Sequence, residues 1–208
     1  RKLIEYGAEK VYLVRDERLE LYQPDVYSGL LKDLIDEIKP EIVLFGATTI
    51  GGDLAATVAA KLETGLTAHC VDLRIDEEGR LVQVVPGFGG NIMVENICPN
   101  RRPQMATVRA GVFKKPERND SAKGEIIRME KEIKEEIFRT KTLEIHEEKP
   151  EGIPLEGAEI IVAGGWGLRS AGFNLVKELA EVLGAAIGGT RPAVDEGWIT
   201  EELSLIHI

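Results

Sequence analysis

Between residues 159 and 191 the sequence runs from an apolar strand through a glycine turn and a helix into a second strand. The segments are Glu159–Ala163 for a buried strand, Gly164–Gly167 for a tight turn, Phe173–Leu183 for a helix and Gly184–Gly189 for the second strand. Strands that alternate with helices in this way pair in parallel and are covered by the helices between them. The sequence therefore predicts an α/β fold.

The helix and the turn of this unit lead to further expectations. Leu175, Val176, Leu179 and Val182 recur at helical spacing and are expected to face the sheet. A glycine turn between a strand and a helix brings backbone N–H groups against a phosphate or diphosphate. Glycine suits this position because a Cβ would block the close approach of a ligand.

The turn only partly matches the dinucleotide fingerprint Gly-x-Gly-x-x-Gly. Gly165 and Gly167 supply the first two glycines, but Ser170 stands at the third position. Thr190-Arg191 follows the second strand, where an acidic residue would hold the ribose of NAD. The turn alone leaves three interpretations open: a structural tight turn, a nicotinamide site and a flavin site.

The first half of the chain shows the same alternation. Helices are predicted at Pro24–Ile38 and Asp53–Glu63, with Asp53 expected to cap the second helix rather than to act in catalysis. Predicted strands are Val11–Val14, Glu41–Phe45, Ala68–Ile75, Arg80–Val85 and Met105–Arg109. In the last strand and the residues just before it, Met105, Ala106 and Val108 are expected to point inward, and Arg102, Gln104 and Arg109 outward. We expect a mostly parallel sheet.

Residues 114–156 differ in character from the rest. Glu125–Phe138 fits either a charged helix or strands, Lys141–Ile145 is strand-like, and Glu147–Gly152 is a predicted linker. We therefore divide the chain into an N-terminal α/β domain, residues 1–150, and the beginning of a second domain, residues 151–208. Arg1 and the short second domain indicate a fragment of a longer protein.

Composition excludes several functions. The net charge is −10 without a basic run, which argues against nucleic acid as a partner. No signal peptide or membrane-spanning run is evident, so we expect no membrane insertion and a cytoplasmic location. Two distant cysteines and three scattered histidines match no metal site or disulfide framework. No nucleophile–base pair is identifiable, so we assign no catalytic and no metal-binding residues.

Three segments together resemble the alpha subunit of electron transfer flavoproteins. They are PEIVLFGATTIGGDLAA at Pro40–Ala56, RPQMATVRAGVF at Arg102–Phe113, and the stretch Ile161–Trp198 that contains the glycine turn. Their order and spacing match the family over nearly the whole chain. The resemblance implies an adenine-nucleotide-hydrolase-like parallel-sheet domain that packs on a beta subunit, followed by the start of a Rossmann-like FAD-binding domain. It also favours strands over a helix for residues 125–145.

The activity that the resemblance implies is electron carriage. FAD would accept electrons from dehydrogenases, as in fatty acid β-oxidation, and pass them to an acceptor. The residues carried over as FAD contacts lie in the turn and after the second strand: Gly164, Gly165, Trp166, Gly167, Thr190 and Arg191. Arg191 would lie beside the isoalloxazine ring, where a cation favours the anionic reduced flavin.

Two features depart from the family pattern. Trp166 stands where the family commonly has an arginine, and Arg169 is a candidate to replace that charge. The family's later FAD contacts would lie beyond Ile208, so we expect this chain alone to bind FAD weakly or not at all. The Arg102–Phe113 segment resembles electron-bifurcating members, but Ala110 replaces their usual proline. An NADP-dependent oxidoreductase, with Arg191 on a 2′-phosphate, and a silent nucleotide-binding module remain as alternatives.

Overall fold

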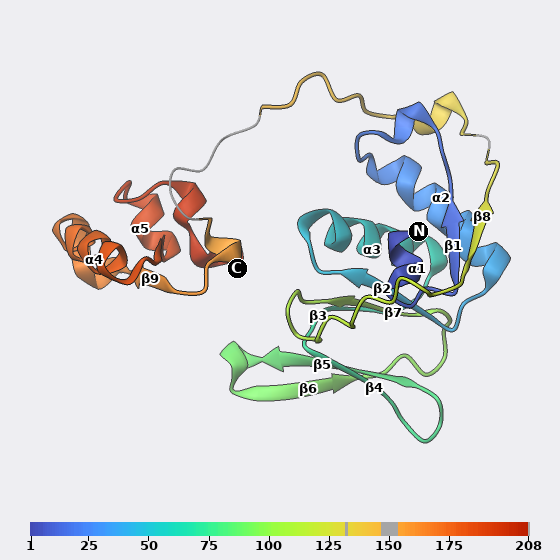
Figure 1. Ribbon diagram of the computed structural model, residues 1–208, viewed down its shortest axis with the longest axis horizontal. Helices are drawn as coiled ribbons and strands as arrows, with labels where there is room; N and C mark the ends of the chain where they lie inside the picture. The colour runs from blue at the N-terminus through green and yellow to red at the C-terminus, as the bar shows by residue number, and fades with distance from the viewer. Residues whose placement is uncertain (132, 147–153, 208) are drawn as a thin grey trace. The chain divides into compact units, whose positions relative to one another are not determined.

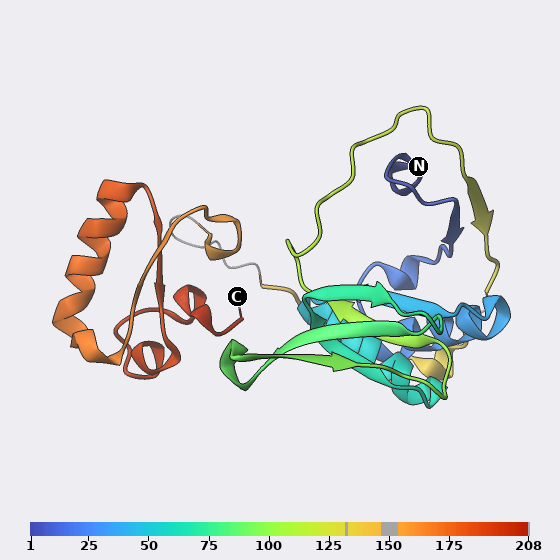
Figure 2. The same cartoon turned by 90° about the horizontal axis from the view of Figure 1, so that it is seen from below.

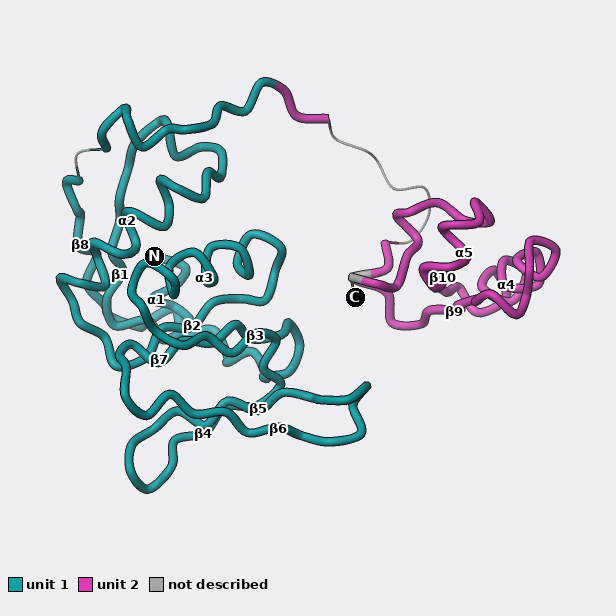
Figure 3. The backbone as a smooth tube through the Cα atoms, turned by 180° about the vertical axis from the view of Figure 1, so that it is seen from behind, with its two compact units in different colours: residues 1–143 teal, residues 144–208 magenta. Residues whose placement is uncertain are grey.

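The computed structural model describes residues 1–131, 133–146 and 154–207. The chain divides into two compact units, Arg1–Leu143 and Glu144–Ile208 (Figure 3). Both units contain parallel strands connected through helices, which confirms the α/β class. The predicted boundary at residue 150 and the predicted linker Glu147–Gly152 lie outside the described residues.

The described residues of the first unit form three α-helices and eight strands. The helices are α1 (Lys2–Glu5), α2 (Pro24–Ile38) and α3 (Thr49–Leu62). The strands are β1 (Lys10–Leu13), β2 (Ile42–Gly46), β3 (Leu66–Cys70), β4 (Asp72–Ile75), β5 (Leu81–Gly87), β6 (Ile92–Asn96), β7 (Gln104–Val108) and β8 (Glu125–Arg128). Helix α2 has the predicted bounds, because Pro24 occupies its first turn and Lys39 ends it in a left-handed conformation.

The centre of the first unit is a parallel sheet in the order β2-β7-β3. Helices α2 and α3 cover one face of this sheet, and the antiparallel sheet β4-β5-β6 lies on the other (Figure 1). Met105 packs among Ile35, Leu54 and Val58 on the helical side, whereas Ala106 packs with Cys70 and Leu81 on the other. Strand β7 is therefore buried on both faces.

This double coverage corrects the prediction for Gln104. We expected its side chain to point outward, but Gln104 is fully buried and its Oε1 accepts a hydrogen bond from the backbone N–H of Leu81 at 2.8 Å. The alternation of polar and apolar residues suggested one solvent-facing side. A second sheet covers that side instead; the turn at Asp76–Gly79 between its first two strands is predicted by the sequence, but its third strand, β6, is not.

The predicted strand Ala68–Ile75 is two strands in two different sheets. His69 has a positive φ of 58°, the register against β7 shifts between Thr67 and Cys70, and β4 then begins at Asp72. Strand β5 pairs antiparallel with both β4 and β6, and β6 had not been predicted. The β5–β6 hairpin extends beside the parallel sheet in Figure 2.

The expected cap of the second long helix is also corrected. Helix α3 begins at Thr49, and the Thr48 hydroxyl oxygen accepts a hydrogen bond from the Gly51 N–H at 3.0 Å. Asp53 lies within the helix, where its Oδ2 accepts a hydrogen bond from the Tyr22 hydroxyl at 2.5 Å. Glycine has a low helix propensity, so Gly51 and Gly52 gave no indication that the helix begins before them.

The segment after residue 114 contains less regular structure than expected. β8 pairs in parallel with β1, and the charged-helix alternative for Glu125–Phe138 is wrong, since the described residues after β8 in this range form only a short 3-10 turn at Glu135–Ile137. The strands expected from the family resemblance are realised at Glu125–Arg128 alone within the described part of residues 125–145. Lys141–Ile145 has no regular structure.

The second unit contains the predicted strand–turn–helix–strand order. Its elements are β9 (Ile161–Gly164), α4 (Arg169–Leu183), β10 (Ala186–Gly189) and α5 (Arg191–Asp195). β9 and β10 pair in parallel, with Gly189 opposite Gly164. Gly184, which we had placed in the second strand, caps α4 in a left-handed conformation with φ of 62°.

Helix α4 presents a different face to the strands from the one expected. Phe173, Val176 and Ala180 are buried, whereas Leu175, Leu179 and Val182 are exposed. Val176 is thus the one member of the predicted set that faces inward. The helix carries apolar residues on two faces, so periodicity alone could not identify the covered one. Among the described residues, no helix is both long and apolar enough to cross a membrane.

Candidate cofactor-binding site

The carboxyl ends of β9 and β10 meet at one edge of the second unit. Gly189 lies opposite Gly164 in the parallel register, and the Thr190 N–H donates a hydrogen bond to the Gly164 carbonyl at 3.0 Å. The glycine turn after β9 and the pair Thr190-Arg191 after β10 are consequently neighbours. Ligands of open parallel sheets bind at this kind of edge, and the structure brings the two predicted groups of residues together there.

The glycines of the turn have different local reasons for being glycine. A Cβ on Gly164 would lie 2.9 Å from the side chains of Leu168 and Phe173, so this glycine permits α4 to pack closely on β9. A Cβ on Gly165 would lie 3.4 Å from the Thr190 side chain. At Gly167 a Cβ would meet no described atom within 4 Å. The space beside the Gly167 backbone is therefore not filled by described protein atoms, and a ligand has room to approach it.

The N-terminus of α4 adjoins this turn. Residues 166–168 form a 3-10 turn that leads into Arg169, and the N-cap residue Leu168 makes no side-chain capping hydrogen bond. The first N–H groups of a helix have no partner within the helix and attract anions. The α4 terminus, preceded by an open glycine turn, is thus suited to a phosphate or diphosphate.

Two arginines add positive charge at this edge. Arg191 begins α5, and its Nε lies 3.5 Å from Asp195 Oδ2, with both side chains largely exposed. An exposed ion pair of this kind holds a side chain only weakly, so Arg191 is free to engage an anionic group. Arg169 has a backbone φ of 54°, in the left-handed region that is unfavourable for non-glycine residues.

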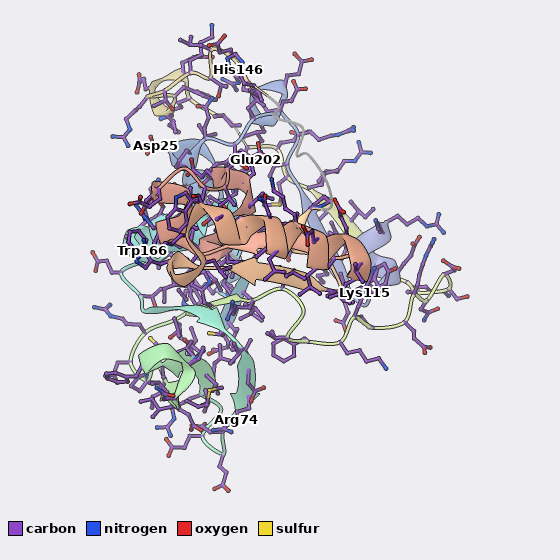
Figure 4. The ribbon with its side chains drawn as sticks, turned by 90° about the vertical axis from the view of Figure 1, so that its left-hand side faces the viewer. Asp25, Arg74, Lys115, His146, Trp166 and Glu202 are labelled. Carbon is purple, nitrogen blue, oxygen red and sulfur yellow. The ribbon has the colours of Figure 1, made fainter. Side chains whose placement is uncertain are left out.

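Trp166 occupies the turn itself. Its indole lies 5.5 Å from that of Trp198, with an angle of 30° between the ring planes, and Trp198 in turn lies 6.2 Å from Phe173. Trp198 packs against the buried cluster of Phe173, Val176 and Ala193, while Trp166 remains 58% exposed (Figure 4). An anchored aromatic ring with an open face is available for stacking at the edge.

Sequence reasoning missed the role of Trp198 in this arrangement. It lies in the Ile161–Trp198 segment, but we assigned it no function there. The chain has only two tryptophans, and both are in this unit. The presence of both tryptophans in this unit was the one sequence feature that pointed to Trp198, although a spacing of 32 residues does not indicate that the two rings are in contact. The strained backbone of Arg169 had no signal in the sequence.

The described residues provide no obvious alternative centre for metal chemistry. No group of three or more histidine, cysteine, aspartate or glutamate side chains is placed to hold a metal ion among them. Both cysteines are free thiols, and burial raises the pKa of the Cys70 thiol. Arg102 and Arg109 are exposed; Arg102 pairs with Glu41 at 2.7 Å.

The fold and the edge define an α/β protein with a nucleotide-cofactor type of site. Comparison with protein families makes this definite: residues 1–134 match the electron transfer flavoprotein domain, and residues 154–205 match the electron transfer flavoprotein FAD-binding domain. The chain therefore belongs to the electron transfer flavoprotein family. The resemblance seen in the sequence and the expected cofactor, FAD, are confirmed at the level of the family.

Individual relatives agree with this placement. The chain is 47% identical over 203 residues to the electron transfer flavoprotein subunit alpha of Thermoanaerobacterium thermosaccharolyticum, covering 97% of this chain and 62% of the relative. It is 46% identical to the subunit alpha of Megasphaera elsdenii, covering 96% of this chain and 60% of that protein. A third relative, 38% identical over 98% of this chain and 49% of its own length, is subunit LctC of lactate dehydrogenase (NAD(+),ferredoxin) from Acetobacterium woodii. The chain thus spans roughly half to three-fifths of the length of these relatives.

Proposed function

We propose that the second unit contributes the first part of an FAD site in an electron transfer flavoprotein alpha subunit. The observation that carries the proposal is the meeting of the glycine turn and Thr190-Arg191 at one strand edge, within residues that match the FAD-binding domain. FAD supplies reversible electron acceptance when it is bound. The protein holds the cofactor and sets its electrostatic surroundings.

Each predicted contact residue has a separate task in this proposal. Backbone N–H groups of Gly165, Gly167 and the first turn of α4 bind a phosphate, and the buried Gly164 fixes the turn on the strand. The Thr190 hydroxyl donates or accepts a hydrogen bond beside the turn. Arg191 places a cation near the flavin ring, which favours the reduced, anionic form of the cofactor.

Trp166 and Arg169 share the task that the family commonly gives to one arginine. The exposed indole of Trp166 stacks on a ring of the cofactor, and the Arg169 guanidinium supplies the charge. The support is the anchored, half-open indole and the strained backbone that presents Arg169. In a full-length subunit, Arg169→Ala should lower FAD occupancy, with Lys177→Ala as a control on the exposed surface of α4. Unchanged occupancy and an unchanged absorbance spectrum would remove Arg169 from the site.

The wider function rests on the relatives. We propose that the protein acts in the cytoplasm as a heterodimer with a beta subunit and transfers electrons from dehydrogenases to an acceptor. Two relatives named as electron transfer flavoprotein alpha subunits support the carrier role. The LctC relative is named as part of a lactate dehydrogenase that uses NAD(+) and ferredoxin, so fatty acid β-oxidation is one of several possible settings.

The test is to produce the full-length alpha subunit together with its beta subunit and to count bound cofactors. A copurified second subunit and a flavin absorbance spectrum support the proposal. Two FAD molecules per heterodimer indicate a bifurcating type, and one FAD with one AMP indicates a simple carrier. Binding of NADP without flavin would support the oxidoreductase alternative, and binding of neither would leave a silent nucleotide-binding module.

A further inference from the structure

Three aromatic rings in the second unit run from the exposed glycine turn to the buried core. Trp166 belongs to the turn after β9, and Trp198 follows α5. The centroids of these two rings are 5.5 Å apart. Trp198 also lies 6.2 Å from Phe173, which is only 3% exposed. Trp198 is therefore the ring that joins the exposed Trp166 indole to the core.

The backbone of Trp198 is fixed by the end of α5. The Trp198 N–H donates a hydrogen bond to the Ala193 carbonyl at 3.0 Å, and the Gly197 N–H donates to the Val194 carbonyl at 2.8 Å. Gly197 has a positive φ of 70°. These two hydrogen bonds around a left-handed glycine form a Schellman motif, which ends a helix with a defined geometry. Hydrogen bonds of the protein itself thus determine the position of Trp198.

The segments on both sides of Trp198 are packed against the core. Ala193, within α5, is fully buried in the same cluster as Phe173. On the other side, the Ile199 side chain fills the space that a Cβ would take at Gly189, at the end of β10. Trp198 is consequently a rigid neighbour for the ring that lies against it.

Trp166 has fewer constraints of its own. It is 58% exposed, and it stands between Gly165 and Gly167, whose backbones have a wide conformational range. A side chain that must be ordered when a ligand binds lowers the affinity, whereas an orientation that is already held avoids this cost. Contact with Trp198 provides such an orientation.

We propose that Trp198 is a positioning residue of the FAD site. It holds the Trp166 indole in the orientation that stacks on a ring of the cofactor, and it acts through Trp166 rather than on the cofactor itself. The inference rests on the proposed function and adds a residue to that site. Helix α5 then serves the site at both ends, because Arg191 begins it and Trp198 follows its terminal glycine.

The contact between the rings is tested first, by circular dichroism of the 208-residue chain. Two indoles this close couple their electronic transitions and give two far-ultraviolet bands of opposite sign. Since the chain has only two tryptophans, the wild type should show these bands, and both Trp166→Phe and Trp198→Phe should lose them. A wild-type spectrum without the bands would overturn the proposal.

Positioning is tested with two variants in which Trp166 is the remaining indole. Trp198→Phe keeps an aromatic ring beside Trp166, and Trp198→Leu keeps an apolar side chain without a ring. The fluorescence anisotropy of Trp166 should be lower in Trp198→Leu than in Trp198→Phe, because its indole turns more freely. Equal anisotropy in the two variants would show that a ring at position 198 does not orient Trp166.

The effect on the cofactor is measured in the full-length subunit with its beta subunit. Trp198→Leu should weaken FAD binding about three- to tenfold, the effect of leaving one side chain to be ordered on binding, and Trp198→Phe should restore most of the affinity. A wild-type heterodimer that binds no FAD would refute the proposed function itself. Equal FAD affinity of the wild type and Trp198→Leu would refute the positioning role alone.

Val176→Ala is the matched control for a loosened core. Val176 is 5% exposed and packs in the cluster with Phe173, but it is not one of the stacked rings. The variant should unfold at a lower temperature and keep both the coupled indole bands and the FAD affinity. A loss of affinity equal to that of Trp198→Leu would assign the effect to general loosening and overturn the proposal.

Discussion

Each unit contains a strand–turn–helix motif, but the side chains near the helix N-terminus differ in charge between the two. β2 leads through a short turn into α3, and β9 leads through a short turn into α4. At α3 the Thr48 hydroxyl already uses the Gly51 N–H, and the Asp53 carboxylate lies in the second turn of the helix. At α4 no side chain caps the first turn, and two exposed arginines lie nearby.

This difference shows what turns a strand–turn–helix motif into an anion site. Glycines and a helix N-terminus are present in both motifs, so they are not sufficient. No side chain should cap the first turn, and positive side chains should lie nearby. At α4 no side chain caps the first turn, and Arg169 and Arg191 lie nearby, the latter paired with Asp195. At α3 the Thr48 hydroxyl caps the first turn instead.

The largest effect is expected from Gly51→Ala in the α3 motif. An added Cβ would lie 2.0 Å from the backbone carbonyl oxygen of Gly46, which cannot move without disturbing β2. We expect a loss of unfolding free energy of about 2–3 kcal/mol, as for other overpacked sites. All four tyrosines lie in the first unit and both tryptophans in the second, so the tyrosine-detected urea midpoint should fall while the tryptophan-detected midpoint stays.

Gly52→Ala is the matched control for that change. It lies in the same helix, and an added Cβ would meet no described atom within 4 Å. Alanine should therefore stabilise the first unit by about 0.5–1 kcal/mol through its higher helix propensity. Equal effects of the two alanines would show that the close contact between Gly51 and Gly46 does not form.

The next effect in size concerns the α4 motif. In the full-length heterodimer, Arg191→Ala should weaken FAD binding about tenfold, or about 1.4 kcal/mol, because a charge-assisted contact is lost. Fluorescence of released flavin on dilution measures the change. Lys177→Ala removes the same charge from the exposed surface of α4 and should leave affinity unchanged. If both variants lose affinity equally, net charge rather than the Arg191 position is responsible.

The sequence predicted most helices and strands of these motifs, but not which helix N-terminus is capped by a side chain. Pro24 and the apolar spacing after it defined α2, and the order of β9, α4 and β10 followed from their hydrophobic pattern. Which N–H groups are already bonded depends on side-chain geometry, and Thr48 and Asp53 are both acceptable caps by residue type. From the sequence, the cap of α3 could therefore be narrowed to Thr48 or Asp53, but not further.

Other features were unpredictable because they depend on neighbours distant in sequence. Gln104 is buried because a second sheet covers β7, and the inward face of α4 depends on which of its two apolar faces meets β9. At the candidate site, the residues of the turn and Thr190-Arg191 could be listed from the sequence. The stacking of Trp166 on Trp198 and the open space at Gly167 required the structure.

A smaller effect is expected from removing the cap of α3. Thr48→Ala eliminates the acceptor for the Gly51 N–H and should cost about 1 kcal/mol in the first unit. Thr49→Ala, one residue further along, serves as the control, because the Thr49 hydroxyl caps no N–H of the helix. Thr48→Ala should also leave an uncapped terminus that resembles α4. Isothermal titration with inorganic phosphate can then ask whether uncapping alone creates an anion site, and we expect no binding.

The smallest effect concerns the Tyr22–Asp53 hydrogen bond beside α3. Burial, and secondarily the Asp53 carboxylate, raises the pKa of the Tyr22 hydroxyl above its usual value. Tyr22→Phe should cost about 0.5–1 kcal/mol at neutral pH. A raised folded-state pKa stabilises the protein fully below the unfolded-state pKa of about 10, and this contribution is lost as the pH rises through the folded value. The difference in unfolding free energy between wild type and Tyr22→Phe should therefore be constant from neutral pH to about 9 and shrink above 10.

Tyr27→Phe is the control, because the Tyr27 hydroxyl donates to the Leu19 carbonyl and not to a carboxylate. It measures the effect of losing a tyrosine hydroxyl that has no carboxylate partner. A difference for Tyr22→Phe that does not change with pH would show that the pKa of Tyr22 is not raised in the folded protein.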